Sequence, residues 1–415
     1  MFKINEPIQR HATRFHPVPD SIQAPAPAAS AAPMRNMPWR DFFALVVSIG
    51  VVGLGLGASM PLTALTLDQR GVGTDVIGLI TAVSALGILA ASPFVSGWVA
   101  RFGPRATMMG AVGAGALATA LMDASANLAA WALLRFVFGA AMGVLFTIGE
   151  AWVNRLAPDN SRGRVVAMYT TSFTLFQLVG PALVALFHGK IGWSFAACGA
   201  LFLFALPGLT LISNSGPVQE ADAQRAPWQS ILPRMPMIVL GAAFFALFDT
   251  LALSLLPLYA IRHGMGAGLA LLSATVVLVG DTALQFVFGW LADRYGRARV
   301  HTACGVMVCL LLPLLPFAVG TPWLWWTLLL LLGAFAGAIY MLSLVACGER
   351  FTGHALTSAS AIVNATWGVA SGAGPLLTGV LMQSAGINAL PAVMWAAAAV
   401  FVASALWERG RRFKG

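Results

Sequence analysis

Residues 289–299 read GWLADRYGRAR and residues 97–105 read GWVARFGPR, so the chain carries one charged loop twice. Each copy follows a long apolar run. The offset between the copies is 192 residues at their starts and 194 at their ends, because the second copy is two residues longer. Other motifs recur at the offset of 194 residues: Gly139 and Gly143 as Gly333 and Gly337, Gly180-Pro181 as Gly374-Pro375, and Gly192 as Gly386. The chain is therefore predicted to contain two copies of one structural unit.

The composition indicates that lipid is the solvent for most of this chain. Of its 415 residues, 59% are hydrophobic and 9% are charged, whereas an ordinary soluble domain is about 25% charged. The 43 Gly and 23 Pro residues also suit membrane helices, which contain both more often than soluble helices do. The four cysteines lie in apolar runs without metal-ligand spacing, and we expect small buried side chains at Cys198, Cys304, Cys309 and Cys347.

Apolar runs of about 20 residues, the length of a transmembrane helix, recur along the chain and predict an all-α integral membrane protein. The twelve predicted spans are 42–66, 76–99, 106–122, 128–153, 165–187, 193–212, 236–259, 267–290, 300–318, 323–346, 357–383 and 390–407. The predicted parts are a disordered cytoplasmic tail (1–40), an N-terminal six-helix bundle (41–212), a cytoplasmic linker (213–235), a C-terminal six-helix bundle (236–408) and a basic cytoplasmic tail (409–415). Because six is even, the two bundles would be parallel.

The positive charges test this topology independently. If the N-terminus is cytoplasmic, segments on that side hold 20 of the 24 Lys and Arg residues, and the outer loops hold only Arg70, Lys190 and Arg262. Such an excess is typical of cytoplasmic loops, so we expect both termini in the cytoplasm. It also accounts for the net charge of +9 without nucleic acid as a partner.

Two motifs resemble those of a known family. The spacing Gly289-x-x-x-Asp293-Arg294-x-Gly296-Arg297-x-Arg299 resembles the major facilitator superfamily signature between helices two and three and again between eight and nine, and Arg135-x-x-x-Gly139 resembles its helix-four pattern. The resemblance covers about residues 40–408. It implies twelve helices in two parallel six-helix repeats, a monomer, and secondary transport.

Further stretches refine the resemblance and also depart from it. Gly53 to Gly71, with Gly149-Glu150-Ala151-Trp152 and Arg162-Gly163-Arg164, resembles a bacterial subgroup of poorly characterised transporters, which implies the inner membrane. The first-half loop lacks the signature aspartate, because Arg101 directly follows Ala100. Phe176 and Ala167 replace glycines that proton-linked drug antiporters have around Gly180-Pro181, so drug antiport receives weak support.

Charged residues inside the spans are the first candidates for function, because charge at membrane depth is unfavourable. Asp249 and Asp281 lie near the middle of their spans, and Arg135 lies about two turns inside the predicted outer end of its span. Burial favours the neutral form of a carboxyl group, so either aspartate could bind and release protons or hold a cationic substrate. Arg135 could hold an anionic substrate or a coupling acid. The alternative for each aspartate is a protonated or hydrogen-bonded carboxyl group that holds helices together. The alternatives for Arg135 are snorkelling to the outer interface and a structural ion pair.

Other charged residues cluster at the predicted cytoplasmic ends. Glu150 could pair with Arg105, Arg162 or Arg164, and the second-half loop could do likewise. We interpret both clusters as an inner gate, and static salt bridges are the alternative. The second-half residues of this predicted gate are Gly289, Asp293, Arg294, Gly296, Arg297, Arg299 and Glu349.

Polar and aromatic residues within the spans are candidates for lining a binding cavity, although each alone is more often a helix contact. These candidates are Gln177, Gln285, Tyr340, Asn364 and Trp367. The glycines Gly139, Gly143, Gly333 and Gly337 form small-x-x-x-small stripes, which predict close helix packing.

Motifs of enzymes are missing from the sequence. It contains no phosphate-binding loop with lysine, no histidine pair with zinc spacing and no Gly-x-Ser-x-Gly. We therefore expect no catalytic site, cofactor or metal, and an ion gradient or the substrate's own gradient as the driving force.

The sequence thus favours a secondary active transporter that moves a small molecule across the lipid bilayer by alternating access, coupled to protons. An uncoupled facilitator and a transporter-like sensor or assembly protein are the alternatives. The sequence leaves open whether the substrate is an anionic or neutral metabolite or a lipophilic cation.

Overall fold

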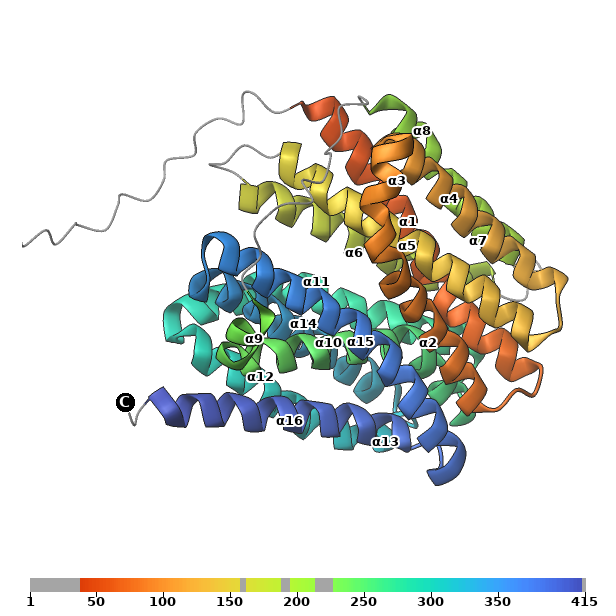
Figure 1. Cartoon of the computed structure of the whole chain (residues 1–415). Helices are drawn as coiled ribbons and strands as arrows, with labels where there is room; N and C mark the ends of the chain where they lie inside the picture. Colours follow the sequence, from red (N-terminus) through yellow and green to blue (C-terminus); the bar gives the residue numbers. More distant parts are fainter. Residues whose placement is uncertain (1–37, 157–161, 188–194, 213–226, 413–415) are drawn as a thin grey trace, which may run out of the picture. The chain divides into compact units, whose positions relative to one another are not determined.

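The computed structural model describes residues 38–156, 162–187, 195–212 and 227–412, and every regular element in these ranges is helical. The first half contains α1 (Trp39–Gln69), α2 (Thr74–Ala91), η1 (Ser92–Phe94), α3 (Val95–Phe102), α4 (Pro104–Ala120), η2 (Leu121–Ala124), α5 (Leu128–Leu156), α6 (Arg162–Phe187), α7 (Phe195–Leu203) and α8 (Ala205–Leu211) (Figure 1). The second half contains α9 (Trp228–Ile231), η3 (Leu232–Arg234), α10 (Pro236–Arg262), α11 (Ala267–Tyr295), α12 (Arg297–Leu311), η4 (Leu312–Leu314), α13 (Leu315–Ala318), α14 (Pro322–Arg350), α15 (Gly353–Ala385) and α16 (Ala389–Arg412).

The helices confirm an all-α membrane protein. Within the described ranges, nine helical stretches are long and apolar enough to cross a membrane. The other three predicted spans fall on α4, on α7 with α8, and on α15. The predicted tail at 1–40 lies outside the described residues up to residue 37, as does most of the predicted linker.

Two boundaries differ from the sequence prediction. The sixth predicted span is interrupted between α7 and α8, where Pro207 has no N–H to donate to the carbonyl of Leu203. In addition, α16 continues to Arg412, so most of the predicted basic tail extends a helix.

Glycines end corresponding helices in the two halves. Gly103 before α4 and Gly296 before α12 have φ of 80° and 92°. Gly71 and Gly264, which follow α1 and α10, have φ of 75° and 90°. Other residues rarely adopt this left-handed region, so the repeated loops have a repeated backbone conformation.

The glycine stripes pack helices closely, as predicted. A Cβ atom on Gly139 of α5 would overlap the backbone of Ser84 in α2, and one on Gly333 of α14 would overlap the backbone of Val277 in α11. The helix pairs α2–α5 and α11–α14 are therefore in backbone contact at matching places.

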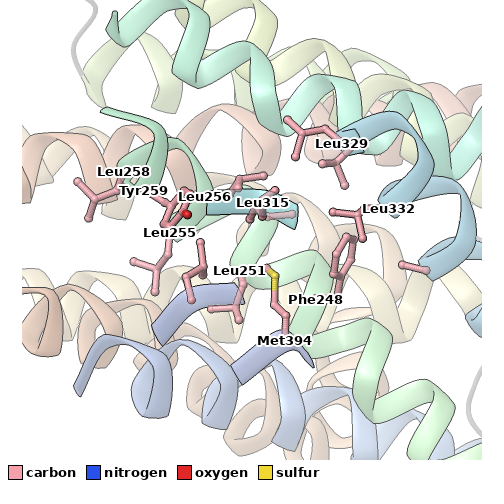
Figure 2. Packing of buried hydrophobic residues seen from close by; sticks show 14 of the residues in the cluster. Phe248, Leu251, Leu255, Leu256, Leu258, Tyr259, Leu315, Leu329, Leu332 and Met394 are labelled. Atoms are coloured by element: carbon pink, nitrogen blue, oxygen red, sulfur yellow. The ribbon is translucent and has the colours of Figure 1, made fainter. Parts of the chain in front are cut away.

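Helix α10 lies at the centre of the apolar core of the second half. Figure 2 shows Phe248, Leu251 and Leu255 of this helix with Leu315, Leu329, Leu332 and Met394, which belong to the same buried cluster. Most residues of α10 are buried, and Asp249 follows Phe248 within this packed helix.

Helices of the two halves also contact one another directly: α2 packs against α15, α6 against α11 and α1 against α10. Asp68 at the end of α1 forms a 2.7 Å ion pair with Arg262 at the end of α10. Thr74 donates a 3.0 Å hydrogen bond from Oγ1 to the carbonyl of Gly379, and its N–H donates one of 3.1 Å to Gln383 Oε1. These polar contacts lie at the predicted outer ends of the helices.

Candidate functional site

Asp281 is buried between α11 and α14. Its side chain is 6% exposed, and Gln285, one turn later on α11, donates a 3.1 Å hydrogen bond from Nε2 to Asp281 Oδ1. The carboxyl group lies against Gly337, where a Cβ atom would overlap Oδ1. The glycine of α14 therefore makes room for a polar group, as well as bringing two helices together.

The first half shows that this packing does not need a carboxyl group. There Gly143 of α5 lies against Ile88 of α2, in the place that Gly337 and Asp281 take in the second half. The other copy therefore makes the same helix contact with an apolar residue at this position. Since a buried carboxyl group is costly unless it is well paired, Asp281 calls for an explanation beyond packing.

Asp249 lies on α10 and is only half-buried. The carboxyl groups of Asp249 and Asp281 lie within electrostatic range of each other. Two carboxyl groups that interact strongly bind and release protons as a pair. The structure thus brings together the two acidic residues that the sequence singled out.

Three aromatic rings lie close together, and one of them belongs to a residue one turn before Asp249. Phe245 precedes Asp249 by one turn of α10, so the two residues share a helix face. The ring centroids of Phe245 and Tyr340 are 5.0 Å apart, those of Tyr340 and Trp367 are 5.1 Å apart, and those of Phe245 and Trp367 are 5.5 Å apart. We call these three residues, from α10, α14 and α15, the aromatic cluster.

Glu150 approaches this region from the first half of the chain. The Tyr340 hydroxyl group lies within electrostatic range of Glu150, Asp249 and Asp281, and that of Tyr169 lies within range of Glu150. Glu150 itself is exposed at its position on α5. Acidic residues of both halves therefore lie within electrostatic range of Tyr340.

Arg135 is fully buried and lies in a different setting. Arg135 is 1% exposed, and none of its three guanidinium nitrogens has a hydrogen-bond partner among the described residues. The guanidinium carbon lies 4.9 Å from the centroid of the Phe138 ring. No ion pair observed among the described residues joins Arg135 to Asp249 or Asp281.

The second-half loop forms a charged cluster at the start of α12. Arg297 pairs with Asp293 at 3.2 Å and with Glu349 of α14, so three predicted gate residues come together. Arg294 instead lies over the rings of Trp290 and Tyr295. Arg299 is exposed, and Gly289 has open space around it.

The first-half gate is only partly visible. Arg105 is half-buried at the start of α4. The side chains of Arg162 and Arg164 lie outside the described part of the chain, so their pairing with Glu150 stays a prediction.

The remaining predicted cavity residues divide by environment. Tyr340 and Trp367 belong to the aromatic cluster, and Gln285 holds Asp281. Gln177 is buried where α6 meets α1, and Asn364 is exposed on α15. Phe245 was not predicted because it is one of 25 phenylalanines; its spacing of four residues from Asp249 could have indicated it.

A cavity of about 810 Å³ lies between α10, α15 and α16, away from these residues. Its lining is apolar except for Asn388. A polar substrate would find few groups there to orient it.

Comparisons with known proteins identify the family and the fold of this chain. The family model described as Major Facilitator Superfamily matches residues 45–281 and 267–412. An uncharacterized MFS-type transporter of Bacillus subtilis (strain 168), YfkF, is 24% identical over 354 residues, which cover 83% of this chain and 89% of that protein. Another, from Enterobacter sp. (strain 638), is 23% identical over 387 residues, covering 89% and 96%.

Solved structures show the same fold. A bacterial homologue of the human lysosomal transporter Spinster, in an inward-facing and unoccupied conformation, aligns with a TM-score of 0.67 and 15% identity over 89% of this chain and 96% of that one. A D-xylose-proton symporter aligns with a TM-score of 0.67 and 16% identity over 88% and 97%. The protein is thus a multi-pass helical membrane protein of the transporter class. More specifically, the chain belongs to the Major Facilitator Superfamily.

Proposed function

We propose that this protein is a secondary active transporter that moves a small molecule by alternating access and couples the movement to protons through Asp249 and Asp281. The observation that carries the proposal is the buried carboxyl group of Asp281, which lies within electrostatic range of Asp249 and stands where the other repeat has Ile88. Buried ionisable residues of this kind often belong to proton or substrate pathways.

The surroundings of Asp281 support proton binding. The side-chain NH₂ group of Gln285 donates to its Oδ1 atom, while the remaining carboxyl oxygen can carry a proton. Because the two aspartates repel each other when both are ionised, uptake of one proton would relieve that repulsion. Protonation would therefore change the relative free energies of the transport states.

Alternating access would open the contacts between α1 and α10 and between α2 and α15 at one end of the molecule. We assign this end to the outer face of a bacterial inner membrane, with both termini in the cytoplasm, because of the Lys and Arg distribution. The charged cluster around Arg297 would then belong to the inner gate.

The test is proton flux in proteoliposomes that contain the full chain and an internal pH-sensitive dye. Pools of anionic, neutral and cationic solutes are added in turn, and we expect one class to evoke proton movement. Asp249→Asn and Asp281→Asn should abolish it, whereas Asp75→Asn, at the start of α2, should not. If both former variants keep proton-linked flux, the coupling role is wrong.

A solute that binds the purified protein without any flux would instead favour the sensor or assembly alternative. Solute flux that ignores a pH gradient would favour the uncoupled facilitator.

A further inference from the structure

The aromatic cluster and the two aspartates form a site with a definite chemical preference. We propose that the substrate of this transporter is an organic cation of the ammonium class, held by the rings of Tyr340 and Trp367 and by the carboxyl groups of Asp249 and Asp281. This inference rests on the proposed transport function and names its substrate class.

The ring geometry suits a cation. The planes of Tyr340 and Trp367 are inclined at 57°, while Phe245 stacks on Tyr340 with an interplanar angle of 14°. Phe245 is 7% exposed, whereas Tyr340 and Trp367 are half-buried. Phe245 thus backs a corner formed by two rings that are still accessible, and a ring face attracts a cation, with tryptophan the strongest.

Acidic residues lie near this corner. Asp249 lies one turn from Phe245 on α10. Asp281 lies against Gly337 of α14, one turn before Tyr340. Glu150 is within electrostatic range of the same tyrosine.

Among the described residues, the observed ion pairs supply no arginine or lysine to Asp249 or Asp281. Arg135, the cation inside α5, lies over Phe138 instead. An anionic ligand would face the carboxyl groups of Asp249 and Asp281, whereas a cation would compensate them, since buried charges need partners. A neutral ligand would leave the charge of these carboxyl groups uncompensated.

The experiment measures binding to the purified full chain in detergent, with no need for transport. The probes are a graded series of quaternary ammonium ions, from tetramethylammonium to tetrabutylammonium, with tetraphenylphosphonium as the largest cation. Isothermal titration calorimetry and tryptophan fluorescence report binding, and benzoate and glucose serve as anionic and neutral comparisons. We expect saturable binding of at least one cation and none of benzoate or glucose.

Variants separate the site from general binding. Trp367→Leu should weaken binding of the tightest-binding cation by roughly two- to thirtyfold, the range of a cation–π contact. Trp367→Phe should lose less affinity because it keeps a ring. Asp249→Asn should weaken it by at least roughly tenfold. Trp323→Leu, at an exposed tryptophan (70%) near the start of α14, should bind like the wild type. Thermal unfolding and size-exclusion profiles verify that each variant is folded.

The proposal is overturned if no cation of the series binds, or if binding survives both Trp367→Leu and Asp249→Asn in folded protein. Proton-linked flux of an anionic or neutral solute, together with absent cation binding, would overturn the substrate class and leave the transport function standing. Cation binding at this site with proton-independent flux would overturn the proton-coupling role and leave the substrate class standing.

Discussion

The contrast between Asp281 and Ile88 is the sharpest at the scale of single residues, because the two repeats provide an internal comparison. Both residues adjoin a glycine of the neighbouring helix: the Asp281 carboxyl group lies against Gly337, and the backbone of Ile88 lies against Gly143. The fold of one copy therefore uses an apolar residue where the other has an acid. Such a replacement separates what the helix contact requires from what the function requires.

We predict that Asp281→Val folds normally and loses proton coupling. Replacing a buried charged group by an apolar one of similar size is often neutral or stabilising, although Gln285 loses its acceptor at a cost of about 1 kcal/mol. Thermal unfolding in detergent should therefore change little, while substrate-evoked proton flux should disappear. Gly337→Ala is the opposite control, because its Cβ would displace the carboxyl group and should lower stability. A Val variant that fails to fold would show that the carboxyl group is structural.

The guanidinium group of Arg135 is fully buried and forms no hydrogen bond to any part of the chain that the structure describes. A buried charge without hydrogen bonds is costly, and replacing even a buried ion pair by apolar residues can stabilise a protein by about 1–4 kcal/mol. Arg135→Met should therefore raise the unfolding temperature, and Arg135→Lys should not. If the charge has a functional role, the Met variant will transport more slowly despite its stability. A lower unfolding temperature for Arg135→Met would contradict this and indicate that the guanidinium group has a stabilising partner.

At the scale of elements, the repeated loop contains two glycines with different roles. Gly296 connects α11 to α12 with φ of 92°, whereas Gly289 lies inside α11 with open space around it. A side chain at the first position is strained by about 1–2 kcal/mol. At Gly289 a side chain removes a flexible residue from a helix, which stabilises the folded state by about 0.5–1 kcal/mol.

We therefore expect Gly296→Ala to lower thermal stability and Gly289→Ala to preserve or raise it. The two variants make the same chemical change within one motif, so each is the control for the other. Thermal unfolding followed by intrinsic fluorescence measures both. Equal losses of stability would mean that backbone conformation does not distinguish the two positions.

The helices were predictable from the sequence because hydropathy reports the length of each apolar segment, whereas their orientation in the membrane stays a prediction. The break between α7 and α8 was missed, since one proline within an apolar run gives no hydropathy signal. The acids Asp249 and Asp281 were found because a charge in an apolar span stands out. Their proximity depends on how α10, α11, α14 and α15 are rotated about their axes, and so does the place of Phe245 beside them. Helices that are apolar on all sides carry little periodic signal from which that rotation could be predicted.

At the scale of the whole molecule, transport requires that contacts between the two halves can break. Among the described residues, the polar contacts between the halves include Asp68 with Arg262 and Thr74 with Gly379 and Gln383 at the helix ends, and Thr275 with the carbonyl of Leu178. The side chains of Asp68 and Arg262 are 20% and 36% exposed, so water screens their attraction. A partly exposed ion pair contributes about 0.2–1 kcal/mol. That is enough to bias two transport states without locking either.

We expect the ion pair between Asp68 and Arg262 to act as a conformational latch between the two halves. Ala85 of α2 lies under Gly372 of α15 and is 5% exposed, so a cysteine there reacts with a maleimide only when these helices separate. In a background without the four natural cysteines, Asp68→Asn should raise the labelling rate of Ala85→Cys by roughly two- to fivefold. The charge exchange Asp68→Arg with Arg262→Asp should restore the slow rate, because it keeps the attraction and reverses its direction. If the single and exchanged variants react alike, the pair does not hold the halves together, and the contacts of Thr74 become the candidate latch.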